Sequence, residues 1–194
     1  MIKQIIKYCD LILEFLLRKA AYNKLKKRSF EQVFVFDLDN TIVNTWGGYN
    51  YDNGAPKFLS FFSIYKNAKA YPEMINLVNS INSNNNFVIF LTARNSIFFR
   101  STKIWLENHL KINNYNLILV NSASRKLGIL DTLSKMGKVN YYDDLSYGHE
   151  FGKIIFYEKI INQVNALPIC FYDFEYISKY NSTNSIEKDV KIYE

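Results

Sequence analysis

Cysteine, proline and long apolar runs are scarce in this 194-residue sequence. Its two cysteines, Cys9 and Cys170, lie far apart in the chain and suit neither a structural zinc site nor a disulfide framework. We therefore expect a reducing, cytoplasmic setting. No run of about 18 uncharged apolar residues is present, which argues against a membrane-spanning helix. The absence of a Gly-x-x-x-x-Gly-Lys loop disfavours an ATP-driven kinase of the P-loop kind.

Hydrophobic residues, by contrast, make up 48% of the chain and aromatic residues 16%. This composition can build a core and predicts a folded domain rather than a disordered chain. The length suits one compact α/β domain with an extension. We expect a basic N-terminal helix over residues 1–28, a main domain over 29–177 and a polar C-terminal tail over 178–194.

Positive charge is concentrated at the N-terminus. Residues 1–28 hold eight Lys or Arg and two acids, so their net charge of +6 equals that of the whole chain. Asp10 and Glu14 lie on one helical face, and the opposite face is apolar: Ile2, Ile5, Ile6, Cys9, Ile12, Leu13 and Leu16. We expect an amphipathic helix whose apolar face packs on the main domain or on a second subunit. A helix that contacts a membrane surface or a nucleic acid is the alternative.

Apolar segments alternate with helical patterns through the rest of the chain. Strands are predicted at 31–37, 87–91, 117–120, 139–142 and 168–172, and helices at 72–83, 101–110, 124–136 and 152–165. This alternation predicts a Rossmann-like, doubly wound parallel sheet of about five strands with helices on both faces.

Polar side chains follow several of these strands at their carboxyl ends. Asp37 and Asp39 end the first strand, and the others are Thr92, Lys126 at a helix start, Asp143 and Asp144. Parallel strands place all these ends at one edge of the sheet, where α/β proteins bind ligands. Paired carboxylates, a cation and a hydroxyl donor are what phosphoryl transfer needs.

At these residues the sequence resembles the haloacid dehalogenase superfamily of phosphatases. The run Asp37–Thr41 matches its first motif, Asp-x-Asp-x-Thr after an apolar strand, and Thr92 matches the second. Lys126 fits the third motif, and the pair Asp143-Asp144 fits the fourth. The resemblance covers roughly residues 31–145. Asp39 argues against dehalogenase chemistry, because a halide leaving group needs no proton and the dehalogenase branch of the family lacks an acid/base aspartate at this position.

The resemblance implies a Mg²⁺-dependent phosphomonoester hydrolase. Asp37 would be the nucleophile that forms an aspartyl-phosphate, and Asp39 would be the general acid and base. Thr92 and Lys126 would bind the phosphate. The metal ligands would be Asp37, Asp39 through its backbone carbonyl, Asp143 and Asp144.

Several assignments have alternatives in the sequence. Arg125 or Lys138 could replace Lys126, and Asp173, which also follows a strand, could replace the Asp143-Asp144 pair as metal ligand. Arg94 either contacts substrate or closes its own loop. His149 is expected on a surface loop.

The intervals between the motifs are too short for a sizeable cap domain. We therefore expect an open site that suits a macromolecular phosphate: a nucleic-acid end, a phosphoprotein, or a glycan or lipid phosphate. Trp46 and Tyr49, in the loop after the first motif, are candidate substrate contacts. A phosphotransferase of the same fold is one alternative function, and a binding protein that acts through residues 1–28 is another.

Overall fold

The computed structural model describes residues 2–27, 30–46, 65–81 and 85–181, and every structural statement below concerns these ranges. The strands are β1 (Gln32–Phe36), β2 (Val43–Asn44), β3 (Lys69–Ala70), β4 (Asn86–Thr92), β5 (Tyr115–Leu119), β6 (Lys138–Tyr142), β7 (Ser146–Tyr147), β8 (Ile155–Phe156) and β9 (Cys170–Tyr172). The helices are α1 (Ile2–Lys27), α3 (Pro72–Ser80), α4 (Phe99–His109), α5 (Lys126–Ser134), α6 (Glu158–Asn165) and α7 (Phe174–Asn181), with the 3-10 turns η2 (Ser96–Phe98), η3 (Ala123–Arg125) and η4 (His149–Phe151).

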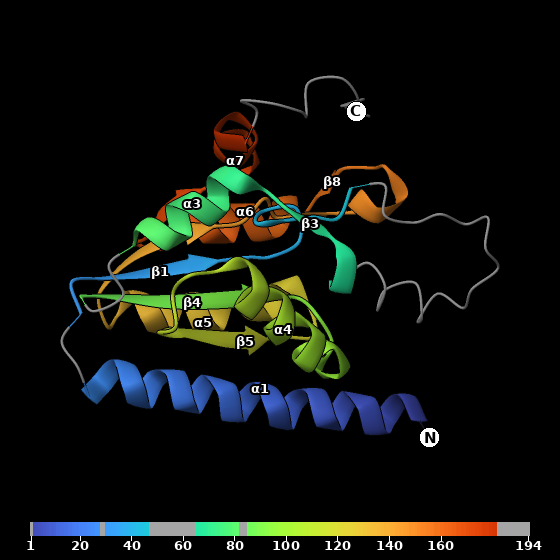
Figure 1. The fold of residues 1–194 in the computed structure, drawn as a ribbon. Coiled ribbons are helices and arrows are strands. Elements are labelled where there is room, and N and C mark those ends of the chain that lie inside the picture. Colours follow the sequence, from blue (N-terminus) through green and yellow to red (C-terminus); the bar gives the residue numbers. More distant parts are fainter. Residues whose placement is uncertain (1, 28–29, 47–64, 82–84, 182–194) are drawn as a thin grey trace.

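The centre of the molecule is a five-stranded parallel sheet with the order β5-β4-β1-β6-β9. Phe36 at the end of β1 is in register with Phe90 of β4 and Tyr142 of β6. The carboxyl ends of these three strands therefore lie side by side, at the right-hand edge of the sheet in Figure 1. The α/β architecture with a parallel sheet is as predicted, and it is Rossmann-like.

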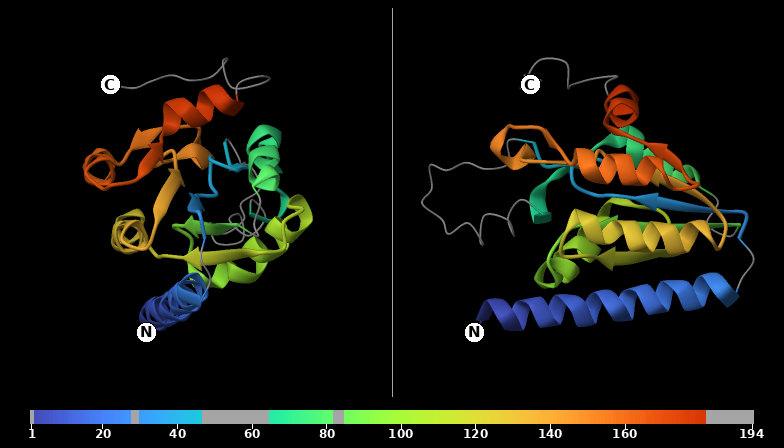
Figure 2. Two further views of the ribbon diagram at one scale, coloured as in Figure 1. Left: turned by 90° about the vertical axis from the view of Figure 1, so that its left-hand side faces the viewer. Right: turned by 180° about the vertical axis from the view of Figure 1, so that it is seen from behind.

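Helices cover both faces of the sheet, as Figure 2 shows end-on. On one face, buried side chains of α5, α6 and α1 pack on β1, β4 and β6. On the other, Met74 and Val78 of α3 and Trp105 and Leu106 of α4 pack on Phe36 and its neighbours. Since both faces are covered, the strands carry continuous apolar runs rather than alternating ones.

The structure differs from the prediction between residues 146 and 157. A helix was expected from 152, but α6 begins at Glu158, and β7 and β8 form a small antiparallel hairpin around η4. Gly148 (φ +89°) and Gly152 (φ +67°) flank η4 in the left-handed region, which ends any regular helix there. At the C-terminus, α7 extends to Asn181, so the expected tail boundary at 178 falls inside a helix.

The long helix α1 runs along the β5 edge of the sheet, as Figures 1 and 2 show. It packs through a face that sequence periodicity assigned to solvent: Asp10 and Glu14 are buried, together with Ala21 and Leu25. The Asp10 carboxylate accepts the N–H of Ser96 at 2.6 Å. The expected arrangement, with the apolar face inward, is wrong for this part of the helix. None of the described helices combines the length and the apolar character that crossing a membrane requires.

Glu14 connects α1 to the start of α5. Its two carboxylate oxygens accept Nε and Nη2 of Arg125 at 2.6 and 2.8 Å. The Glu14 side chain is only 3% exposed, whereas that of Arg125 is 40% exposed. A bidentate pair of this kind is stronger than a surface ion pair because one partner is shielded from water.

Glu14→Gln is expected to lower the free energy of unfolding by about 1–2 kcal/mol, since a charged hydrogen-bond pair is lost while Arg125 can return to water. Glu107→Gln is the matched control. Its carboxylate pairs with Lys103 at 3.6 Å on the exposed surface, and its loss is expected to cost less than about 0.5 kcal/mol. Urea denaturation compares the two variants, and equal losses would contradict a structural role for the Glu14 pair.

Candidate active site

A tight turn after β1 positions the two aspartates of the first motif. The N–H of Asp37 still pairs with the carbonyl of Tyr142 on β6, at 2.8 Å. The chain then turns so that the carbonyl of Leu38 accepts the N–H groups of Thr41, Ile42 and Val43. Asn40 takes φ +59° in this turn, a conformation that Asn tolerates better than most residues. The turn fixes Asp37 and Asp39 at the carboxyl edge of the sheet.

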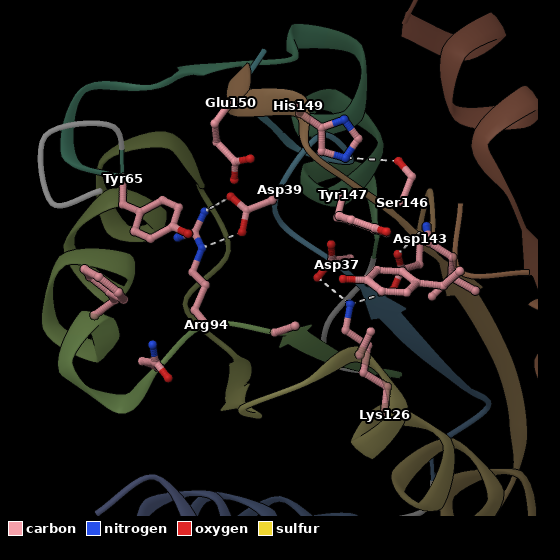
Figure 3. Close-up of a pocket in the computed structure, with 16 residues that line it drawn as sticks. Asp37, Asp39, Tyr65, Arg94, Lys126, Asp143, Ser146, Tyr147, His149 and Glu150 are labelled. Carbon is pink, nitrogen blue, oxygen red and sulfur yellow. Dashed lines mark hydrogen bonds and ion pairs between the residues drawn. The ribbon is translucent and has the colours of Figure 1, made fainter. Parts of the chain in front are cut away.

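Lys126 is the cation that contacts Asp37 and Asp143. Its Nζ donates to Asp37 Oδ1 at 2.8 Å and to Asp143 Oδ2 at 2.6 Å, so it joins the ends of β1 and β6 (Figure 3). All three side chains are more than nine-tenths buried. Asp143 is also held by the hydroxyl of Tyr141 and by the N–H of Leu145. Lys126 therefore lies beside Asp37, and its role in phosphate binding stays a prediction.

Three carboxylates form a compact buried group beside this lysine. Oxygens of Asp37, Asp143 and Asp144 all lie within 4.8 Å of one another, which is close enough for one metal ion to contact all three. Asp144 is held in turn by hydroxyls, with Ser146 Oγ at 2.5 Å from Oδ2 and Thr41 Oγ1 at 3.4 Å from Oδ1. Oxygen ligands of this type suit Mg²⁺.

The electrostatics of the group show that one ammonium does not balance it. Burial raises the pKa of Asp37 to about 8; Lys126 opposes this shift, and Asp143 adds to it. Burial also raises the pKa of Asp143, again against Lys126. Burial alone would lower the pKa of Lys126, yet Asp143 and Asp37 raise it above the ordinary lysine value. The ionised form of the group therefore carries more negative charge than Lys126 balances, and a divalent cation would stabilise that form.

Asp39 points away from this group and pairs with Arg94. Nη2 and Nε of Arg94 donate to Oδ1 and Oδ2 of Asp39 at 2.5 and 2.8 Å (Figure 3). The guanidinium carbon lies 3.9 Å from the centre of the Tyr65 ring, and Nη1 donates to Thr102 at 3.0 Å. Arg94 therefore both orients Asp39 and ties it to α4.

Thr92 ends β4, the strand next to β1. The residue is fully buried, and its hydroxyl has no hydrogen-bond partner within the described part of the chain. Most buried hydroxyls are paired, so the Thr92 hydroxyl lacks a partner that a ligand could supply, although Thr92 is not among the residues that line the cavity beside Asp37. The role in phosphate binding that the second motif implies for Thr92 stays a prediction.

A cavity of about 300 Å³ opens over these residues. Asp37, Asp39, Arg94, Lys126 and Asp143 line its floor, and the side chains around it come mainly from the 146–157 segment and from Tyr65: Ser146, Tyr147, His149, Glu150 and Tyr157. Figure 3 shows the side chains of Glu150, His149 and Tyr147 above Asp39 and Asp37. A hairpin after the fourth motif thus narrows the site that the motif spacing alone predicted to be open.

His149 is buried rather than on a surface loop, which corrects the sequence expectation. Its Nε2 lies 3.1 Å from Asp144 Oδ2 and 3.0 Å from Ser146 Oγ. Although burial alone would lower the pKa of His149, the hydrogen bond to Asp144 raises it. The sequence did not predict the contact between His149 and Asp144, because it depends on the turn at Gly148 that brings His149 back over Asp144.

The alternative site residues lie elsewhere. Arg125 pairs with Glu14, and Lys138 starts β6 at the opposite end of the sheet. Asp173 is outside the carboxylate group and accepts the N–H of Tyr176 at the start of α7.

Trp46 is half-buried, with its ring centroid 6.4 Å from that of His149, and it does not line the cavity. Tyr49, the other predicted substrate contact in this loop, lies outside the described residues. Comparison of the sequence with family models and with curated proteins finds no match to this chain.

Proposed function

We propose that this protein is a Mg²⁺-dependent phosphomonoester hydrolase of the haloacid dehalogenase type. One observation carries the proposal: the buried ammonium of Lys126 joins Asp37 and Asp143 within a group of three carboxylates at the carboxyl edge of a parallel sheet. The unpaired Thr92 hydroxyl supports it from the neighbouring strand. Such a group favours an anionic substrate that arrives with a divalent cation.

The donor set fits Mg²⁺, because it consists of oxygens and leaves negative charge uncompensated. Asp37, Asp143 and Asp144 would hold the ion, together with the backbone carbonyl of Asp39. When bound, Mg²⁺ would offset the repulsion between Asp37 and the phosphate oxygens.

The residues of the chain would carry the two chemical steps. A carboxylate oxygen of Asp37 attacks phosphorus, and the bond to the leaving oxygen breaks as that oxygen takes a proton from Asp39. Asp39 then removes a proton from water, which attacks the aspartyl-phosphate, releases phosphate and restores Asp37. Because both oxygens of Asp39 receive N–H groups of Arg94, this ion pair has to separate when substrate enters.

The cavity bears on the class of substrate. A volume of about 300 Å³ takes a phosphate and a modest part of the group attached to it. A larger substrate would place its phosphate in the cavity and leave its remainder outside. A nucleic-acid end, a phosphoprotein, and a glycan or lipid phosphate all meet this requirement.

Hydrolysis of an aryl phosphate tests the proposal. Turnover is expected with Mg²⁺ and is expected to vanish with EDTA. Mg²⁺ at about 100 times its Kd should stabilise the fold by about 2.7 kcal/mol, which corresponds to a rise in Tm of about 5–10 °C for a chain of this size. Turnover that is undiminished by EDTA, or no turnover at all, would contradict the proposal. Transfer of the phosphoryl group to an added alcohol instead of water would assign a phosphotransferase.

A further inference from the structure

The face of α1 that points away from the sheet is not covered by any described part of the chain. Four of its large apolar side chains are more than half exposed: Tyr8 (69%), Ile12 (59%), Phe15 (52%) and Leu16 (55%). They lie within about two and a half turns of helix and span about 12 Å of its axis. In Figures 1 and 2, α1 forms one outer boundary of the molecule beside β5, so this face is accessible.

The same face carries positive charge and no described negative charge. Lys19, Lys26 and Lys27 are exposed on it, and the ammonium of Lys19 lies 5.9 Å from the centre of the Phe15 ring. Both acids of the helix point the other way, since Asp10 and Glu14 are buried against Ser96 and Arg125. The packing of α1 therefore withdraws its negative charges from the surface and leaves an apolar patch that continues into a cationic one.

Exposed apolar side chains next to lysines are the features by which a helix binds an anionic membrane surface. We propose that the outward face of α1, defined by Tyr8, Ile12, Phe15, Leu16, Lys19, Lys26 and Lys27, binds the surface of an anionic lipid bilayer. The apolar side chains would enter the boundary between headgroups and acyl chains, and the lysines would contact anionic headgroups. The helix would lie in the plane of the surface, and the proposal is independent of the catalytic function.

Other partners match the face less well. A second copy of the chain would bring lysines against lysines in a parallel arrangement, or apolar residues against lysines in an antiparallel one. Four exposed apolar side chains are also few for a stable interface of about 1,000 Å² or more. A nucleic acid would match the positive charge but would not explain why four large apolar side chains are exposed on the same face of the helix.

The two exposed cysteines allow a direct test on the full-length chain. Cys9 lies on α1, and Cys170 lies on β9 at the opposite edge of the sheet. An environment-sensitive fluorophore is attached to Cys9 in the Cys170→Ser variant, and to Cys170 in the Cys9→Ser variant as control. The probes are vesicles of phosphatidylcholine alone, vesicles that also contain phosphatidylserine, and a short oligonucleotide.

With phosphatidylserine vesicles, the Cys9 label is expected to shift to the blue, and added salt should reverse the shift, while the Cys170 label should not change. Substituting Lys19, Lys26 and Lys27 together by Gln should weaken vesicle binding on the order of 100-fold, at about fivefold per lysine. The triple variant Ile12→Ser, Phe15→Ser and Leu16→Ser should weaken it at least about tenfold. Ile104→Ser, at a comparably exposed apolar residue on α4, is the matched control and should bind as the parent does.

Three results would overturn the proposal. The first is no shift with either kind of vesicle. The second is a shift of the Cys9 label that grows with protein concentration in the absence of lipid, which would assign the face to a second copy of the chain. The third is a shift with the oligonucleotide and none with vesicles, which would assign it to nucleic acid.

Discussion

Asp37→Asn is expected to lower the turnover of an aryl phosphate by on the order of 10⁴-fold or more, because an amide cannot take over the attack on phosphorus. Lys126 would keep its bond to Asp143 at 2.6 Å, so the remaining site should stay assembled. Steady-state kinetics at saturating Mg²⁺ measures the effect. When the reaction is stopped with acid, protein-bound phosphate from the substrate should be found in the parent and not in the variant.

The same substitution is expected to leave the Tm of the metal-free protein unchanged or higher. Burial raises the pKa of Asp37 to about 8, whereas an aspartate in the unfolded chain ionises near pH 4. Between about pH 4 and 8 the folded state therefore disfavours the charge that the unfolded state carries, and stability falls as the pH rises through this window. Asn resembles the neutral form and removes this cost, so the gain should be larger at about pH 7 than at about pH 4.

Asp173→Asn is the matched control, since Asp173 also follows a strand of the sheet but lies outside the carboxylate group. It should keep both its turnover and its stability, because the Oδ1 of an asparagine can still accept the N–H of Tyr176 and Asn caps a helix about as well as Asp. A folded Asp37→Asn protein with full turnover would contradict the assignment of the nucleophile. Loss of turnover together with loss of the folded state would be assigned to structure instead.

The elements that the sequence predicted best are the central strands. Runs such as Phe87–Leu91 are apolar throughout, and so short an apolar run is typical of a strand that is covered on both faces. Once β1, β4 and β6 are parallel, their carboxyl ends must meet at one edge. The proximity of Asp37, Thr92 and Asp143 therefore follows from local patterns and topology, without any knowledge of side-chain contacts.

The features that the sequence did not predict depend on partners distant in the chain. The helical periodicity predicted that Asp10 and Glu14 face solvent. In the structure they are buried against Ser96 and Arg125, which lie about 90 and 110 positions away in the chain. A buried acid is tolerated where a donor or a cation pairs with it, and no local sequence pattern reports that partner. The 146–157 hairpin was missed for a related reason, because its apolar residues have helical spacing and only the left-handed Gly148 and Gly152 reverse it.

Lys126→Met is expected to lower both the stability and the turnover of the protein strongly. It removes the ammonium that Asp37 and Asp143 share and leaves two buried carboxylates without a counter-charge. Breaking a buried ion pair from one side costs about 3–5 kcal/mol, which corresponds to a fall in Tm of about 6–20 °C for a chain of this length. Turnover should fall by on the order of 10²–10³-fold as well, because phosphate would face Asp37 without the neighbouring cation.

The double variant Lys126→Met with Asp143→Asn separates the two effects. Removing one of the two uncompensated charges should recover part of the lost stability, while turnover stays low because a metal ligand is now missing too. Lys135→Met is the matched control: its ammonium pairs with Asp131 at 2.6 Å on the exposed surface, and the loss should be below about 0.5 kcal/mol.

Urea denaturation in EDTA at about pH 5 and 8 measures all three variants. The defect of Lys126→Met should shrink at the lower pH, because protonation then neutralises the carboxylates; a defect that is equal at both pH values would mean that packing of the lysine side chain, and not its charge, holds the site together.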